Sequence, residues 1–121
     1  MGKAILIIGH GSRSKEAQTI FNKIVDHVRN KSEFKLVEGA HMELCEPSIP
    51  ETVDKLVEKG ANEIIFVPYF LYEGIHIKED IPDIVNELSQ KYNEVQFKMA
   101  KPIGAEPVLA EILLTRAKQA I

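Results

Sequence analysis

Two histidines and one glutamate are the residues of this sequence whose types and spacing best suit chemistry. His10 follows the apolar run 4–8, His76 comes after the apolar run 63–67, and Glu43 lies 33 residues from each histidine. Two imidazoles and a carboxylate are ligands for a borderline divalent metal ion such as Co²⁺, Ni²⁺, Fe²⁺ or Zn²⁺. The same groups accept protons near neutral pH. A functional site is predicted if the fold brings these three residues together.

The elements that must position these residues alternate between strand and helix. The hydrophobic patterns predict strands at 4–8, 36–42, 63–67 and 95–99, and helices over 17–28, 48–60, 80–92 and 106–121. Four strand–helix units in a row indicate an α/β fold with a parallel sheet and helices on both faces. Right-handed crossovers and the apolar first and third strands favour the strand order 2-1-3-4, with the fourth strand at an edge.

Two features of the predicted helices are specific expectations. Asp80 is expected to be the N-cap of the third helix, with Pro82 in the first turn, where a missing N–H costs little. The last helix is expected to turn one face inward. That face consists of Val108, Leu109, Ile112, Leu113 and Ala117.

The predicted topology also locates the site. Ligands of open parallel sheets bind beyond the carboxyl ends of the strands, where the strand order reverses. This point lies between the first and third strands, which His10 and His76 follow, and one strand–helix unit later the chain returns Glu43 to the same rim. The alternative interpretations are a turn role for His10 between two glycines and a surface-loop role for His76.

The composition sets further limits. A length of 121 residues predicts one domain spanning 1–121, and a net charge of −3 argues against nucleic acid as a partner. Cys45 is the one cysteine, which excludes a disulfide within the chain or a multi-cysteine zinc site and favours a cytoplasmic location. Because no apolar run approaches the length of a membrane span, no membrane partner is expected.

Five segments, taken in order, resemble the sirohydrochlorin chelatases of class II. They are Ala4 to Arg13 with its Gly9-His10-Gly11-Ser12, Met42 to Pro50 with its Glu43-Leu44-Cys45-Glu46, Val67 to Leu71, Gly74 to Pro82, and Lys101 to Gly104. The resemblance covers nearly the whole chain. It implies a chelatase-like fold related to flavodoxin. It also implies either a short form that pairs as a homodimer or the N-terminal half of a long form.

The implied activity is insertion of a divalent metal ion into the tetrapyrrole sirohydrochlorin. Co²⁺ is favoured, with Fe²⁺ and Ni²⁺ as alternatives, so that the pathway is that of cobalamin, sirohaem or a nickel cofactor. The metal ion is a substrate, and no tightly bound cofactor is expected. The rival functions are a carrier of metal or tetrapyrrole, an inert half of a longer protein, and a histidine phosphatase. A phosphatase would need an arginine before its histidine, where Gly9 stands here.

The resemblance also assigns roles to residues. It makes His10 and His76 the residues that handle metal and protons, together with a carboxylate that we assign to Glu43, with Glu46 as its rival. Expected contacts of the acidic substrate are Ser12, Arg13, Lys15, Lys78 and Lys101. An apolar loop is expected either to line the pocket for the macrocycle or to be buried at a dimer interface. For Phe70 and Leu71 the alternative is packing in the core. It contains Tyr69, Phe70, Leu71, Tyr72 and Ile75. Structural roles are expected for His27, His41 and Cys45.

Overall fold

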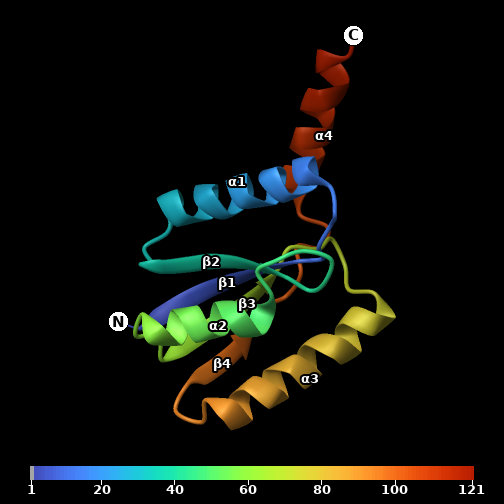
Figure 1. Cartoon of the computed structure of the whole chain (residues 1–121). Coiled ribbons are helices and arrows are strands. Elements are labelled where there is room, and N and C mark those ends of the chain that lie inside the picture. Colours follow the sequence, from blue (N-terminus) through green and yellow to red (C-terminus); the bar gives the residue numbers. More distant parts are fainter. Residues whose placement is uncertain (1) are drawn as a thin grey trace.

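A computed structural model of the chain describes residues 2–121, apart from the side chain of His76. Strands and helices alternate along the chain, as the hydrophobic patterns predicted (Figure 1). The elements are β1 (Lys3–Gly9), α1 (Lys15–Lys31), β2 (Leu36–His41), α2 (Ile49–Glu58), β3 (Glu63–Pro68), α3 (Ile75–Lys91), β4 (Gln96–Met99) and α4 (Pro107–Gln119).

The four strands form one parallel sheet in the order β2-β1-β3-β4, which confirms the predicted topology. In the register, Ile5 of β1 lies between Val37 of β2 and Ile65 of β3. β4 pairs with β3 alone and is an edge strand, as predicted. The central strands β1 and β3 therefore carry their carboxyl ends to the middle of one rim, where the loops of the site begin.

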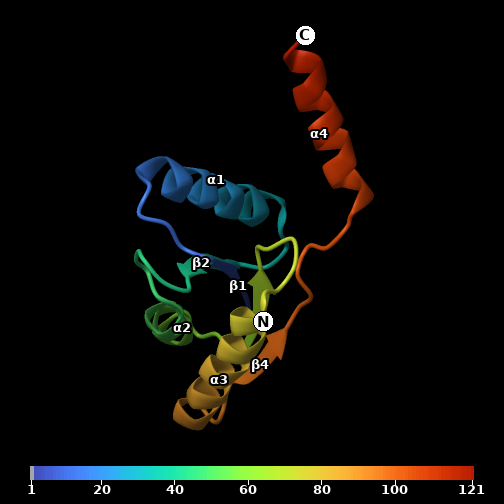
Figure 2. The same cartoon turned by 90° about the vertical axis from the view of Figure 1, so that its right-hand side faces the viewer.

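Helices lie on both faces of the sheet (Figure 2). On one face, Phe21 and Val25 of α1 pack against Ile7 and Val37. On the other face, α2 and α3 cover a larger core. Its fully buried members include Leu6, Ile8, Ile49, Val53, Leu56, Ile64, Phe66 and Ile81. Burial of these apolar side chains is the main force that holds the layers together.

The second helix begins as the sequence indicated. Ser48 is the N-cap, and its hydroxyl oxygen accepts a hydrogen bond from the Glu51 amide at 3.3 Å. The Glu51 carboxylate in turn accepts from the Ser48 amide at 2.6 Å, which completes a capping box. Gly60 follows the end of α2 with a φ of +99°, the left-handed conformation that favours glycine.

The expected start of the third helix was wrong. α3 begins at Ile75 after Gly74 as its N-cap, so that Asp80 lies inside the helix and Pro82 interrupts it. Pro82 has no N–H to donate to the carbonyl of Lys78, which is a cost for the helix. Ile77 and Ile81, on either side of this defect, pack against the core and offset that cost. Tertiary contacts therefore extend α3 by more than one turn beyond the local signal.

The expected burial of the last helix was also wrong. None of the described side chains of α4 is buried, and Figures 1 and 2 show the helix standing away from the rest of the molecule. The face predicted to point inward is instead exposed at Val108, Ile112 and Leu113, with exposed fractions of 56%, 46% and 69%. Neither α4 nor another described helix is long and apolar enough to cross a membrane.

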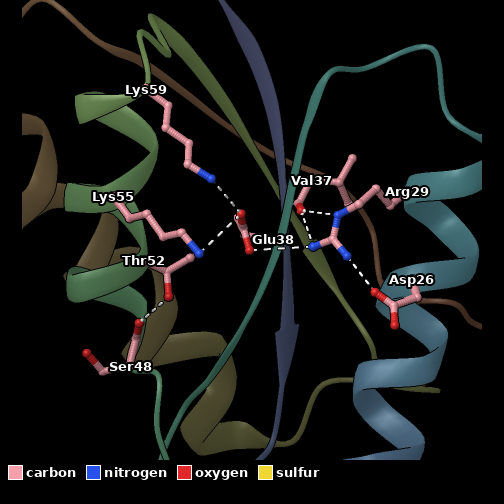
Figure 3. A network of polar contacts seen from close by, with 8 residues as sticks. All are labelled: Asp26, Arg29, Val37, Glu38, Ser48, Thr52, Lys55 and Lys59. Carbon is pink, nitrogen blue, oxygen red and sulfur yellow. Dashed lines mark hydrogen bonds and ion pairs between the residues drawn. The ribbon is translucent and has the colours of Figure 1, made fainter.

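A charged network at the β2 edge joins this strand to helices on both faces (Figure 3). The carboxylate of Glu38 lies 3.4 Å from the ammonium group of Lys55 and 3.3 Å from that of Lys59, both on α2. On the other side, the guanidinium of Arg29 lies 3.5 Å from Glu38 and donates to the carbonyl of Val37 at 2.7 Å. Because β2 is an edge strand, these charges also shield its unpaired side.

Candidate functional site

His10 lies at the predicted place, directly after β1 at the carboxyl rim of the sheet. Its side chain is exposed. The imidazole ring meets the ring of Phe70 edge to face, with the centroids 6.0 Å apart and the planes at 78°. Gly9 before it permits close packing, since a Cβ there would approach the Phe21 ring to 2.8 Å. The histidine is therefore held on a well-packed strand end and still faces solvent.

The loop after β2 lies against the loop after β1. The Met42 amide donates to the Gly9 carbonyl at 2.9 Å, which extends the β1–β2 pairing beyond the strands. Gly11 has a φ of +104° and leaves room for the backbone of Glu43. These contacts bring Glu43 beside His10, although the two residues are 33 positions apart.

The loop after β3 reaches the same rim. Its start is fixed by a hydrogen bond from the Tyr69 amide to the Ile8 carbonyl at 2.8 Å. Phe70 is half-buried and packs against the core, so core packing and contact with His10 are both realised in one residue. Leu71 and Ile75 are exposed, with exposed fractions of 56% and 77%. This apolar loop therefore offers open surface beside the histidine.

A cavity of about 520 Å³ opens where these loops meet α3. It is lined by His10, Met42, Glu43, Ile77, Asp80, Asp83 and Ile84. The structure thus brings His10 and Glu43 into one cavity, as the sequence predicted. It adds Asp80 and Asp83, which the sequence analysis did not assign to the site. Imidazole nitrogen and carboxylate oxygen are donor types that suit a divalent metal ion.

Helical spacing was the signal that identifies the two aspartates. Asp80 lies one turn after position 76 in α3, and Asp83 lies three residues further on, so the spacing places both positions on one side of the helix. The sequence analysis missed them because it started the helix at Asp80 and treated that carboxylate as a cap.

A smaller cavity of about 240 Å³ lies on the other side of His10 and includes Ser12 and Tyr69. His41 also lines it, but it is buried, with its ring centroid 4.7 Å from that of Phe21. Burial lowers the pKa of His41 from its ordinary value of 6.5. His41 is therefore a packed residue at the base of the site, as expected from the sequence.

Several predicted residues lie outside both cavities. Arg13 and Lys78 are exposed, and they are not among the residues that line either cavity. Glu46 is exposed too and lies outside the cavity that contains Glu43, which favours Glu43 as the carboxylate beside His10. Lys15 and Lys101 are likewise exposed surface lysines.

His76 is the second residue of α3, which follows the loop after β3. Its side chain lies outside the described part of the structure, so the predicted contact of the two histidines is not tested. Among the described side chains, no three His, Cys, Asp or Glu residues are already gathered closely enough to hold a metal ion. A metal ligand set therefore stays a prediction that includes His76.

A larger cavity, of about 600 Å³, lies at the opposite rim. It includes Gly2, Lys3, Phe34, Leu36 and Gly60. These residues are at the amino ends of β1 and β2 and in the turn before β3, away from the switch point where ligands of parallel sheets bind. We therefore assign the site to the cavity of about 520 Å³ that His10 and Glu43 line.

Comparison with known proteins agrees with this fold. A family model described as CbiX matches residues 4–120. A sirohydrochlorin cobaltochelatase of Sulfolobus acidocaldarius is 38% identical, over 97% of this chain and 91% of the relative. The chloroplastic sirohydrochlorin ferrochelatase of Arabidopsis thaliana is 30% identical over 97% of this chain, which matches 52% of the relative.

Solved structures agree as well. The sirohydrochlorin chelatase SirB from Bacillus subtilis subspecies spizizenii, in complex with cobalt, superposes with a TM-score of 0.92 and 31% identity. The alignment covers 98% of this chain and 51% of the SirB chain, so this chain corresponds to one half of it. The chain therefore belongs to the CbiX family, and with it to the short class II chelatases that its sequence motifs resemble.

Proposed function

We propose that the chain is a sirohydrochlorin chelatase that inserts a divalent metal ion, with Co²⁺ favoured over Fe²⁺ and Ni²⁺, into the tetrapyrrole. The observation that carries the proposal is the pairing of His10 and Glu43 in one cavity at the carboxyl rim of the sheet. The 38% identity to a sirohydrochlorin cobaltochelatase, over 91% of that relative, supports the choice of reaction and of metal.

Insertion exchanges two protons for one metal ion. The metal ion binds the pyrrole nitrogens and two pyrrole N–H protons leave, so that charge is balanced. Imidazoles at His10 and His76 suit both the release of the metal and the uptake of these protons. Glu43 beside His10 orients this imidazole or neutralises positive charge as the proton arrives.

The substrate is expected to lie over the exposed rim. Tyr69, Phe70, Leu71 and Ile75 offer apolar surface to the macrocycle, and their partial exposure supports this role. The substrate carboxylates are expected to meet Arg13, Ser12 and Lys78 from the solvent side. A single chain gives the macrocycle one wall, so we infer that two copies pair as a homodimer.

The proposal places the enzyme in the cytoplasm. The support for this location is the use of cysteine, since Cys45 has no second cysteine in the chain to pair with.

The test is anaerobic turnover of the purified full chain. Sirohydrochlorin is mixed with Co²⁺, Fe²⁺ or Ni²⁺ in parallel, and insertion is followed by the absorbance change. We expect rates above the protein-free control that fall at least about 100-fold in His10→Ala and in His76→Ala. His27→Ala is the matched control, because His27 is an exposed histidine of α1 outside the two rim cavities. Tight binding without turnover would indicate a carrier, and hydrolysis of a phosphate ester instead would indicate a phosphatase.

A further inference from the structure

The smaller cavity beside His10 contains a buried histidine that the proposed reaction does not use. His41 is 5% exposed and borders this cavity of about 240 Å³. Its ring packs against Phe21, but no hydrogen bond among the described residues involves its imidazole. Every fully buried side-chain nitrogen or oxygen of the described residues has a hydrogen-bond partner. The nitrogens of His41 are therefore not sealed in the core, and the cavity is the space into which they open.

The charges around this cavity favour an anion. Three carboxylate side chains line the cavity of about 520 Å³ on the other side of His10, whereas none of the described residues that line the smaller cavity is Asp or Glu. Ala17 and Gln18, in the first turn of α1, border the smaller cavity at the rim where β1 ends (Figure 1). Glu16 of that turn is exposed and does not line the cavity. The amino end of a helix carries partial positive charge, so an anionic group is favoured on this side of His10 and a cation on the other.

Ser12 supplies a second hydrogen-bond donor to the cavity. Its hydroxyl oxygen accepts from the Ser14 amide at 3.0 Å, which leaves the hydroxyl hydrogen available to a ligand. The side-chain amide of Gln18 donates to the Ser12 carbonyl at 2.8 Å and holds this loop against α1. An imidazole N–H and a hydroxyl are donors that suit the oxygens of a carboxylate.

We propose that this cavity binds a carboxylate side chain of the tetrapyrrole, with His41 and Ser12 donating hydrogen bonds to it. The inference rests on the proposed function and names the contact that fixes the orientation of the macrocycle. Because His10 lines both cavities, a carboxylate held on one side of it places the macrocycle beside the cavity where the metal ion is expected. His41 is then a specificity-determining residue, since a tetrapyrrole without a carboxylate at the matching position loses this contact.

The first experiment tests the cavity without tetrapyrrole or metal ion. Propionate is titrated into the ¹⁵N-labelled full chain at constant ionic strength, and the amide signals of Gly11, Ser12 and Gln18 are followed by NMR. We expect saturable shifts with a Kd of about 1 to 50 mM, since a ligand of so few atoms gains little binding free energy. Propionamide has the same shape without the charge, and it should bind at least about tenfold more weakly.

Variants of the two donors connect the shifts to the cavity. His41→Phe keeps an aromatic ring against Phe21 but removes the N–H, so propionate should bind at least about tenfold more weakly. His41→Gln retains an N–H donor and should lose less affinity than His41→Phe. Ser12→Ala should weaken binding at least about threefold. Ser32→Ala is the matched control, because the Ser32 hydroxyl accepts from the Phe34 amide in the same manner at the other end of α1, outside the cavity.

The second experiment measures anaerobic insertion of Co²⁺ by the full chain. We expect His41→Phe and Ser12→Ala each to raise KM for sirohydrochlorin about tenfold and to leave KM for Co²⁺ within about twofold of wild type. A merely structural role would not separate the two substrates in this way. His27→Phe makes the same change of residue type at an exposed position of α1 and should leave both KM values unchanged.

Several results would overturn the carboxylate site. They are the absence of saturable shifts up to about 200 mM propionate, equal binding of propionamide, or wild-type affinity in both His41→Phe and Ser12→Ala. A KM raised for Co²⁺ rather than for sirohydrochlorin in His41→Phe would make His41 a metal ligand instead. If His41→Phe loses the NMR spectrum of the folded chain, Ser12→Ala and His41→Gln decide the question.

The two proposals can fail separately. A chain that bound propionate as expected but inserted no metal ion would refute the chelatase proposal and leave the carboxylate site standing. A chain that inserted metal with an unchanged KM for sirohydrochlorin in both variants would refute the carboxylate site alone.

Discussion

A Cβ atom placed on Gly11 would lie 1.8 Å from the carbonyl oxygen of Glu43. Gly11 also has a φ of +104°, which side chains other than glycine rarely adopt. The loop that carries His10 and the loop that carries Glu43 can therefore lie together only with glycine at position 11.

Replacing Gly11 by alanine is expected to force these two loops apart. We expect the free energy of unfolding to fall by at least about 2 kcal/mol, from the clash and the strained φ together. Urea denaturation measures this loss. Gly74→Ala is the control, because a Cβ there meets nothing within 4 Å and φ is −74°, so that it should cost no more than about 1 kcal/mol. Equal losses in the two variants would show that the close approach does not matter.

Glu43 and Glu46 are expected to differ in activity. Glu43→Gln removes the charge beside His10, and we expect kcat/KM for metal insertion to fall about 100-fold. Glu46→Gln is the matched control, because this exposed carboxylate is outside the cavity, and its activity should stay within about twofold of wild type. Steady-state insertion assays give both values. The reverse order would assign the site to Glu46.

Asp80 and Asp83 are expected to act on the metal ion before insertion. Their carboxylates line the cavity of His10 and attract a divalent cation toward it. We expect Asp80→Asn and Asp83→Asn each to raise KM for the metal about tenfold while kcat changes little. Glu79→Gln, an exposed neighbour on α3 that does not line the cavity, is the control. An unchanged KM in both aspartate variants would exclude this role.

His41 is expected to make stability depend on pH. Burial lowers its pKa in the folded chain below the ordinary 6.5. As the pH falls below about 6.5, His41 becomes protonated in the unfolded chain but stays unprotonated in the folded chain. The free energy of unfolding therefore decreases as the pH falls from about 6.5 to the lower pKa of the folded chain. His41→Gln should therefore lose less free energy of unfolding than wild type between pH 7.5 and pH 5.5.

The control for this measurement is His27→Gln, since His27 is exposed on α1. It should lose as much stability as wild type over the same interval. If His41→Gln and wild type lost equal amounts, the buried imidazole would not be the source of the pH dependence.

The sequence by itself determined the sheet and the rim on which the site lies. Continuous apolar runs at β1 and β3 indicate central strands that are buried on both faces, and the amphipathic stretches between them require crossover helices. Once the order 2-1-3-4 follows, His10 and Glu43 must return to one rim, because each follows the carboxyl end of a parallel strand. Local periodicity was sufficient for these statements.

Only the tertiary structure decided where α3 begins, which residues line the cavity, and whether the apolar face of α4 is buried. The start at Ile75 depends on packing of Ile77 and Ile81 around Pro82, which local signals oppose. That longer helix brings Asp80 to the cavity as a wall residue rather than a cap. The apolar pattern of α4 correctly indicated a face that needs cover, but a pattern in one chain does not specify which surface covers it. Only the folded structure shows that the described part of the chain leaves this face of α4 exposed.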